Sequence, residues 1–226
     1  MMADEGRQPS GALTIFGRAT SSNVQLVMWA VAELGLPYER LDYGHDFGGL
    51  DSAEYLAMNP HGKVPVLRDG DLVLWESCAI LRYMAAAYGD GGAFWPADPA
   101  ARARVDMWAE WGKNEMAQGF TVPIFWSRIR TAAADRDEAA LTRAVAGFEA
   151  LLAALEGQLD GQDYVVGNVL TAADITVGHL LFRWFDIDVP RQPRPNVEAY
   201  YQRLTARAAY REHVMVDYGV LRATGA

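Results

Sequence analysis

The sequence predicts an α+β protein in which a small mixed sheet with helices precedes an all-helical part. Three observations predict this class. Short apolar strands alternate with helical patterns in the first third of the chain, an Asp-Gly pair lies between two apolar runs, and no convincing strand pattern follows residue 99. At 226 residues the chain is long enough for one large or two small domains.

The first half of the sheet part reads as strand, helix and strand. LTIF (13–16) has the length and apolarity of a short strand, and apolar residues then recur at helical spacing over 22–34. Gly35 stands where a helix C-terminal glycine is expected. YERLDY (38–43) alternates as a second strand. A right-handed crossover through the helix makes these two strands parallel.

The second half reads as strand, strand and helix. In VPVLRDGDLVLW (64–75), Asp69-Gly70 lies between two apolar runs, which is a strong signal for a two-residue hairpin. The two strands are therefore expected to be antiparallel. A helix then starts at Glu76 and runs toward Tyr88. Together the two halves predict βαβ followed by ββα, a four-stranded mixed sheet.

Glycines and prolines without periodicity mark residues 90–98 as a linker. We therefore expect a disordered tail over 1–11, a sheet domain over 12–89 and a helical domain over 99–226. Asp98-Pro99, a cap residue before a first-turn proline, begins the first helix of the helical domain. The further helices are expected over 136–158, 171–185, 196–206 and 208–214.

Two helix starts have the spacing of a capping box, in which two side chains satisfy free backbone N–H groups. One is Ser22 with Gln25, and the other is Thr171 with Asp174. The second is assigned a structural role in folding the helical domain. The first explains Ser22 but leaves the polar residues on either side of it unexplained.

The amino-acid composition limits which binding partners and which cellular compartment are expected. A net charge of -9 argues against nucleic acid and anionic membranes as partners, because no cluster of basic residues is present. No apolar run approaches the roughly 18 residues that span a bilayer. A single cysteine, Cys78, allows no internal disulfide and fits a reducing, cytoplasmic setting. The four histidines lie far apart, so no metal site is expected.

The stretch NPHGKVPVL (59–67) raises the prospect of a small-molecule site, because Pro65 interrupts a strand. In one reading a cis Val64-Pro65 bond turns the backbone of Val64 outward to pair with a peptide-like ligand. In the other reading Pro65 only protects a sheet edge. The spacing alone favours neither.

A second candidate is the helix start at Glu76-Ser77. Ser77 and neighbouring N–H groups suit a carboxylate and Glu76 suits an ammonium, which are the charged groups of an α-amino acid. The alternative is that Ser77 is only an N-cap. Taken together, the motifs describe a peptide-like ligand whose other end faces the helix start at Ser21, Ser22 and Asn23.

These motifs, in their order, resemble the cytosolic glutathione transferases, and serine-type bacterial members in particular. The order is S-x-N at 21–23, N-P-x-G-K-V-P-V-L, W-E-S-x-A-I-L and T-A-A-D-I, and the resemblance covers residues 13 to about 215. It implies a thioredoxin-like N-terminal domain that binds glutathione and an all-α C-terminal helical bundle that shapes the electrophile pocket. It also implies a homodimer.

The resemblance implies a role for each matching residue. The catalytic group is Ser21, Asn23 and Ser22, with the Ser21 hydroxyl donating to the glutathione sulfur. The residues that bind glutathione as a co-substrate are Lys63, Val64, Pro65, Glu76 and Ser77. The electrophile pocket is assigned Arg18, Trp108, Trp111 and Glu115. No metal is implied.

One departure from the family concerns Leu26, which stands where related classes have arginine or lysine. The Ser21 hydroxyl and the helix start must then activate the thiol without that cation. The expected reaction is conjugation of glutathione with a small electrophile. The alternatives are a glutathione-dependent peroxidase or disulfide reductase, and a related binding module without turnover.

Overall fold

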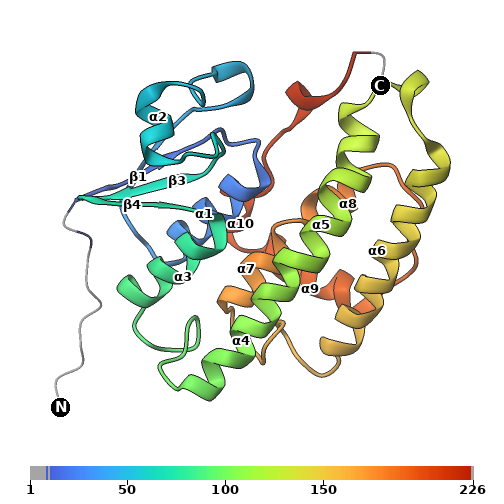
Figure 1. The fold of residues 1–226 in the computed structure, drawn as a ribbon. Coiled ribbons are helices and arrows are strands. Elements are labelled where there is room, and N and C mark those ends of the chain that lie inside the picture. The colour runs from blue at the N-terminus through green and yellow to red at the C-terminus, as the bar shows by residue number, and fades with distance from the viewer. Residues whose placement is uncertain (1–8, 10, 225–226) are drawn as a thin grey trace.

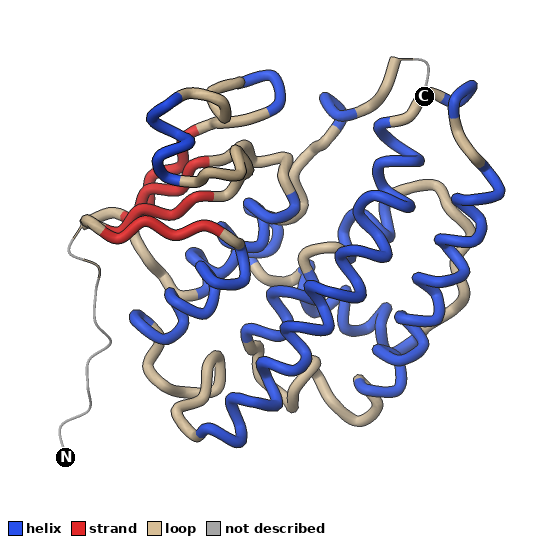
Figure 2. The backbone as a smooth tube through the Cα atoms, in the orientation of Figure 1, coloured by secondary structure: helices blue, strands red, loops and turns tan. Residues whose placement is uncertain are grey.

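The structure, a computed structural model, describes residue 9 and residues 11–224. The tail expected over 1–11 therefore lies almost entirely outside the described residues. Figure 1 shows the sheet part lying beside the helical part, and Figure 2 shows all four strands gathered on one side of the molecule. Within the described residues, no helix is long and apolar enough to cross a membrane.

The sheet has the mixed topology that the sequence predicts. Its strand order is β2-β1-β3-β4, with β1 (Leu13–Phe16) parallel to β2 (Tyr38–Leu41). β3 (Val66–Asp69) runs antiparallel to β1 and to β4 (Leu72–Trp75). In this register Ile15 lies opposite both Arg40 and Leu67. Phe16, the last residue of β1, pairs with Val66, which in turn pairs with Trp75, the last residue of β4. The segments that lead into α1 and α3 therefore leave the same end of the sheet.

The expected hairpin joins β3 and β4, with its loop one residue later than predicted. Asp69 still pairs with Leu72, so the two loop residues are Gly70 and Asp71. Gly70 has a φ of 57°, a left-handed conformation that glycine adopts at little cost. Glycine at the first loop position therefore sets the turn.

Helices cover both faces of the sheet (Figure 1). α1 (Ser22–Glu33) and α3 (Ser77–Tyr88) pack on one face, and α2 (Ala53–Met58) lies on the other. Successive strand residues point to opposite faces. Accordingly Ile15 belongs to the large core beneath α1 and α3, whereas Phe16 belongs to a small core beneath α2.

The helical part begins with one long helix that Asp98 caps by accepting from a first-turn N–H at 2.8 Å. It runs continuously through α4 (Pro99–Trp111), η2 (Gly112–Met116), α5 (Ala117–Phe120) and η3 (Thr121–Arg130). The η2 and η3 segments are π-helical, a conformation frequent at functional sites. The sequence did not predict where this helix ends, and its extension to Arg130 matters for the site.

Three later helices match the expected ranges: α6 (Glu138–Gln158), α9 (Pro195–Thr205) and α10 (Ala208–His213). Short 3₁₀ turns that the sequence did not predict occupy η1 (His45–Phe47), η4 (Ala133–Asp135) and η5 (Gly219–Leu221).

The single helix expected over 171–185 is instead two, α7 (Ala172–Gly178) and α8 (Leu181–Asp186). The Tyr210 hydroxyl causes the break. It donates to the carbonyl of Gly178 at 2.9 Å and accepts from the N–H of Phe182 at 3.2 Å. A side chain inserted into the backbone ladder is a recognised cause of helix interruption.

The large core continues from the sheet part into the helical part. Trp29 of α1 packs edge-on against Tyr210 of α10, with ring centroids 4.8 Å apart. Arg207 donates from Nε to Glu33 of α1 at 2.7 Å. Because one core joins both parts, the division at residues 90–98 stays a proposal.

Candidate active site

A cleft of about 280 Å³ lies where the start of α1 faces the helical part. One wall comes from the sheet part and includes Arg18, Ser21, Ser22, Asn23, Lys63 and Val64. The other wall comes from η3, α8 and η5 and consists of Thr121, Phe125, Trp126, Arg130, Arg183 and Leu221. Six of the residues predicted from sequence therefore meet in one cavity.

Ser21 is the N-cap residue of α1, yet its side chain makes no capping hydrogen bond. It is 9% exposed and lines the cleft. An N-cap serine normally accepts a hydrogen bond from an N–H of the first helical turn. Here the Ser21 hydroxyl makes no hydrogen bond within the described residues. It is therefore available to a ligand.

The capping box expected from Ser22 and Gln25 is wrong. The helix begins one residue earlier than that box requires, which makes Ser22 the first helical residue. The Gln25 amide instead donates to the carbonyl of Ala19 at 3.0 Å. Gln25 thus closes the loop that carries Ser21, and Ser22 lines the cleft from the first turn.

The Val64-Pro65 peptide bond is cis, which was one of the two readings of this stretch. Val64 lines the cleft, and Pro65 is buried behind it. Two side chains hold the backbone of Lys63, the residue before Val64. The hydroxyl of Tyr55 and the amide of Asn59 both donate to the carbonyl of Lys63 at 2.8 Å. The Lys63 side chain is exposed at the cleft.

Lys113 joins the two parts of the molecule at the start of α3. Its Nζ donates to Oδ1 of Asn23 at 2.8 Å and to Oγ of Ser77 at 3.1 Å. Ser77, which is 1% exposed, also donates to Asn23 at 3.3 Å. Leu26, which stands where related classes have a cation, lies wholly in the core. Lys113 brings a cation to the site from another direction.

Sequence reasoning missed Lys113, because it lies 90 residues from Asn23 on a different helix. One signal was available. Lys113 and Lys63 are the only two lysines in a chain whose other cations are arginines. Both lie at this site.

Glu76, rather than Ser77, is the N-cap of α3, so Ser77 does not have the capping role of the alternative reading. Glu76 has a φ of 71°, a left-handed conformation uncommon for residues other than glycine. Its exposed side chain makes no capping bond. Glu76 does not line the cleft itself but adjoins it through Ser77 and Asn23.

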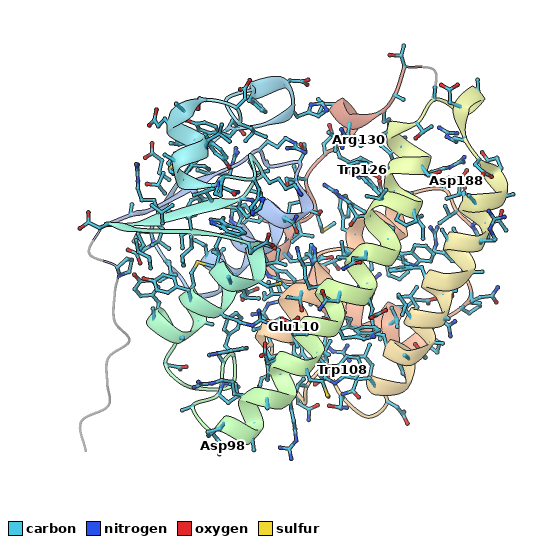
Figure 3. All side chains as sticks on the ribbon, viewed as in Figure 1. Asp98, Trp108, Glu110, Trp126, Arg130 and Asp188 are labelled. Atoms are coloured by element: carbon cyan, nitrogen blue, oxygen red, sulfur yellow. The ribbon has the colours of Figure 1, made fainter. Side chains whose placement is uncertain are left out.

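The structure does not bring Trp108, Trp111 or Glu115 to the cleft. The two tryptophans pack against each other with ring centroids 5.0 Å apart, half-buried on the core, and Glu115 is exposed. Figure 3 shows Trp108 toward the Asp98 end of the long helix, far from Trp126 near its other end. Because the helix continues to residue 130, its later turns reach the cleft instead. Arg18 alone of the expected electrophile pocket lines it.

Cys78 lies next to Ser77 but is buried in the large core. Burial raises the pKa of its thiol, so at neutral pH it stays protonated. A buried, protonated thiol is a poor nucleophile. Among the described residues, no group of three or more histidine, cysteine or acidic side chains suits a metal ion.

Known proteins match this chain along most of its length. The glutathione S-transferase N-terminal domain model matches residues 11–86, and the C-terminal domain model matches residues 138–203. Glutathione S-transferase GstB of Escherichia coli K12 is 38% identical over 206 residues, which cover 90% of this chain and 98% of the relative. Glutathione S-transferase 3 of Zea mays is 30% identical and covers 89% of this chain and 93% of its own.

The fold also matches a solved structure. A theta class glutathione S-transferase from Xanthomonas axonopodis pv. citri, with glutathione bound, is 40% identical with a TM-score of 0.86. The match covers 93% of this chain and 99% of that one. These matches bear out the resemblance seen in the sequence: the chain belongs to the glutathione S-transferase family.

Proposed function

We propose that this protein is a glutathione transferase that adds the glutathione thiolate to a small electrophile. The observation that carries the proposal is the Ser21 hydroxyl, which sits at a helix start and faces a cleft without a hydrogen-bond partner among the described residues. The relatives named glutathione S-transferase support the reaction class. The neighbour with glutathione bound supports the co-substrate.

The Ser21 hydroxyl would act as a donor to sulfur and not as a nucleophile. A free thiol has a pKa near 8.5, and lowering it by two units requires about 2.7 kcal/mol. A hydrogen bond to a charged group supplies about 1.5 to 3 kcal/mol. A helix N-terminus adds about 0.3 to 1 kcal/mol. The two contributions are large enough together, so no histidine base is required.

The rest of the site supports one orientation of glutathione. Val64 would pair its backbone with the cysteinyl unit, and Lys63 would neutralise a carboxylate at the glycyl end. Ser77 and Lys113 would hold the γ-glutamyl carboxylate, with Glu76 taking the ammonium. Lys113 supports this because its ammonium already lies 3.1 Å from the Ser77 hydroxyl. Asn23 would keep Ser77 and Lys113 in place.

Glutathione affinity capture followed by a conjugation assay tests the proposal. Wild type should be retained on immobilised glutathione and should conjugate it to an electrophile. Ser21→Ala should be retained but should raise the pKa of bound glutathione, which the absorbance of the thiolate reports. Ser22→Ala is the matched control and should leave that pKa unchanged.

Four outcomes would change the assignment. If wild type were not retained on immobilised glutathione, the proposal that it binds glutathione would be overturned. Retention with turnover of a hydroperoxide or a disulfide, but of no electrophile, would favour the peroxidase or reductase alternative. Retention without any turnover would favour a binding module. If only Ser22→Ala lost turnover while folded, Ser22 would replace Ser21 as the donor.

The homodimer and the cytoplasmic, detoxifying role also belong to this proposal. The resemblance supports a dimer, with α3 and α4 as the interface candidates. Met107 on α4 is 60% exposed, an apolar side chain of the kind that interfaces cover. Sedimentation equilibrium tests this, because a mass near 24.9 kDa at micromolar concentration would exclude a stable dimer.

A further inference from the structure

The cleft carries an unbalanced positive charge. Its lining includes Arg18, Lys63, Arg130 and Arg183 and contains no carboxylate, although the whole chain has a net charge of -9. None of these four cations forms a salt bridge among the described residues. Arg128 differs from them in this respect. It lies on the same helix as Arg130, but its guanidinium forms a salt bridge with Asp188 at 2.9 Å.

Arg183 is the most buried of the four, at 3% exposed. One nitrogen donates to the carbonyl of Thr20 at 2.6 Å, and the guanidinium lies 4.4 Å from the centroid of the Phe125 ring. Its Nε is buried without a partner among the described residues. Buried charges in proteins are normally paired, because leaving one unpaired costs several kcal/mol. This guanidinium therefore retains unused capacity to bind an anion.

Arg18 repeats the pattern on the opposite wall. Its Nε is also buried without a partner within the described chain. Burial, followed by the charge of Arg130, lowers its pKa. The carboxylate of Asp46 opposes this effect, but Asp46 is exposed and its Oδ1 lies 3.0 Å from Nδ1 of His45. Burial and the other two arginines likewise lower the pKa of Arg183, to about 10, so it stays charged at neutral pH.

Aromatic rings accompany these charges. The guanidinium of Arg130 lies 4.4 Å from the centroid of the Trp126 ring, and Phe125 lies beneath Arg183. Figure 3 shows Arg130 and Trp126 together near the end of the long helix. Guanidinium groups bind carboxylates through paired hydrogen bonds, and aromatic faces favour a flat ring.

We propose that the electrophile of this enzyme is an aromatic compound bearing a carboxylate, held by Arg18, Arg130 and Arg183 beside Phe125 and Trp126. This inference rests on the proposed function and names the substrate class of the same cleft. Lys63 is left to glutathione, so the three arginines distinguish the second substrate from the first. A purely structural role is the alternative, because Arg183 supports the loop before Ser21 by donating to the carbonyl of Thr20. That role accounts for only one donor of Arg183 and gives Arg18 and Arg130 no role.

A pair of electrophiles that differ only in charge tests the proposal: a chlorodinitrobenzoate and the corresponding chlorodinitrobenzamide. In both reactions the glutathione thiolate forms a carbon–sulfur bond and chloride leaves with the electron pair of the carbon–chlorine bond. The thiol proton passes to solvent. Each kcat/KM is divided by the uncatalysed rate constant with glutathione at the same pH, which removes the difference in intrinsic reactivity.

Wild type should prefer the benzoate at least tenfold on this corrected scale. Arg130→Gln and Arg18→Gln should each reduce the preference to threefold or less, through the KM for the benzoate, while the KM for glutathione stays unchanged. Arg128→Gln is the matched control and should keep the full preference, because Arg128 pairs with Asp188 outside the cleft. Equal corrected rates for the two compounds in wild type would overturn the inference and leave the proposed function standing.

A binding measurement separates the two levels of the proposal. Dinitrobenzoate and dinitrobenzamide lack a leaving group, so calorimetry reports their affinity whether or not the enzyme turns over. Tighter binding of the benzoate that Arg130→Gln abolishes would uphold the anionic subsite even if conjugation failed. Amide binding as tight as benzoate binding would overturn the subsite even if conjugation of neutral electrophiles succeeded.

Discussion

The starts of α7 and α1 are both built from short polar side chains, but they use them differently. At α7, Thr171 and Asp174 form the complete capping box that the sequence predicts. Asp174 is 0% exposed, and it also accepts from the N–H of Val165 and the hydroxyl of Tyr200. At α1, the Ser21 hydroxyl bonds to nothing in the described chain and faces a cleft.

This difference separates a helix start whose hydroxyl is committed to holding the helix from one whose hydroxyl has no partner among the described residues. A hydroxyl that already holds backbone groups has no capacity left for a ligand. A hydroxyl that leaves its own cap unmade can donate to a substrate, at the cost of some helix stability.

Asp174→Ala should lower the free energy of unfolding by about 3 to 5 kcal/mol, since it leaves several buried donors unsatisfied. Denaturant unfolding at pH 7 measures this loss. Asp137→Ala is the control, because Asp137 makes a comparable but exposed cap bond to Ala140 at the start of α6. That control should lose only about 1 kcal/mol. Equal losses would mean that the burial of the α7 cap adds nothing.

The free energy of unfolding should depend on pH through the carboxyl group of Asp174. Burial raises the pKa of Asp174 from 3.8 to about 6, against the opposing effect of its hydrogen bonds. A raised pKa favours the folded state when the group is protonated, so this contribution is complete below about pH 4 and is lost by about pH 6. The loss amounts to about 3 kcal/mol. Asp174→Asn cannot ionise, and a wild-type curve parallel to that of Asp174→Asn would contradict the assignment.

Ser21→Ala and Thr171→Ala should separate activity from stability. Ser21→Ala should reduce kcat/KM about 10- to 100-fold, which corresponds to the loss of one hydrogen bond to a thiolate. It should change the free energy of unfolding by less than about 0.5 kcal/mol, because no cap bond is lost. Thr171→Ala should cost about 1 to 2 kcal/mol of stability. A stability loss at Ser21 as large as that at Thr171 would show that the α1 hydroxyl is structural after all.

Lys113→Met should have the smallest effect, raising the KM for glutathione about fivefold through the loss of a cation beside Ser77. Steady-state kinetics with varied glutathione measures it. Arg104→Met is the matched control on the same helix, where Arg104 is exposed and forms no salt bridge within the described residues. If both variants left the KM unchanged, Lys113 would have no part in glutathione binding.

Features set by neighbouring residues were predictable from the sequence. The Thr171–Asp174 box and the hairpin follow from patterns that span only a few residues, and the mixed sheet follows from the order of such local elements along the chain. The same local reasoning placed the α1 N-cap one residue late and predicted a capping box that is not formed, because a run of polar residues does not fix which of them is the N-cap.

Features set by distant residues were not predictable. Tyr210, which interrupts the helix between α7 and α8, lies 32 residues after Gly178 in the sequence. Lys113 and Arg183 reach the start of α1 only through the packing of the helical part. The prediction that Trp108 and Trp111 line the electrophile pocket was not met for a related reason. The helical period predicts which residues share a face, but it does not predict how far the helix extends.

The hydrogen bond from Arg183 to Thr20 has a consequence for how such an enzyme can change. Arg183 belongs to the wall proposed to hold the electrophile, yet it also donates to the carbonyl of the peptide bond next to Ser21. Under the proposed function, a substitution at this arginine that alters the choice of electrophile also disturbs the Ser21 hydroxyl that would donate to sulfur. Selectivity and thiol acidity are therefore inherited together here, and a chimera that exchanges the helical part would have to supply an equivalent arginine to remain active.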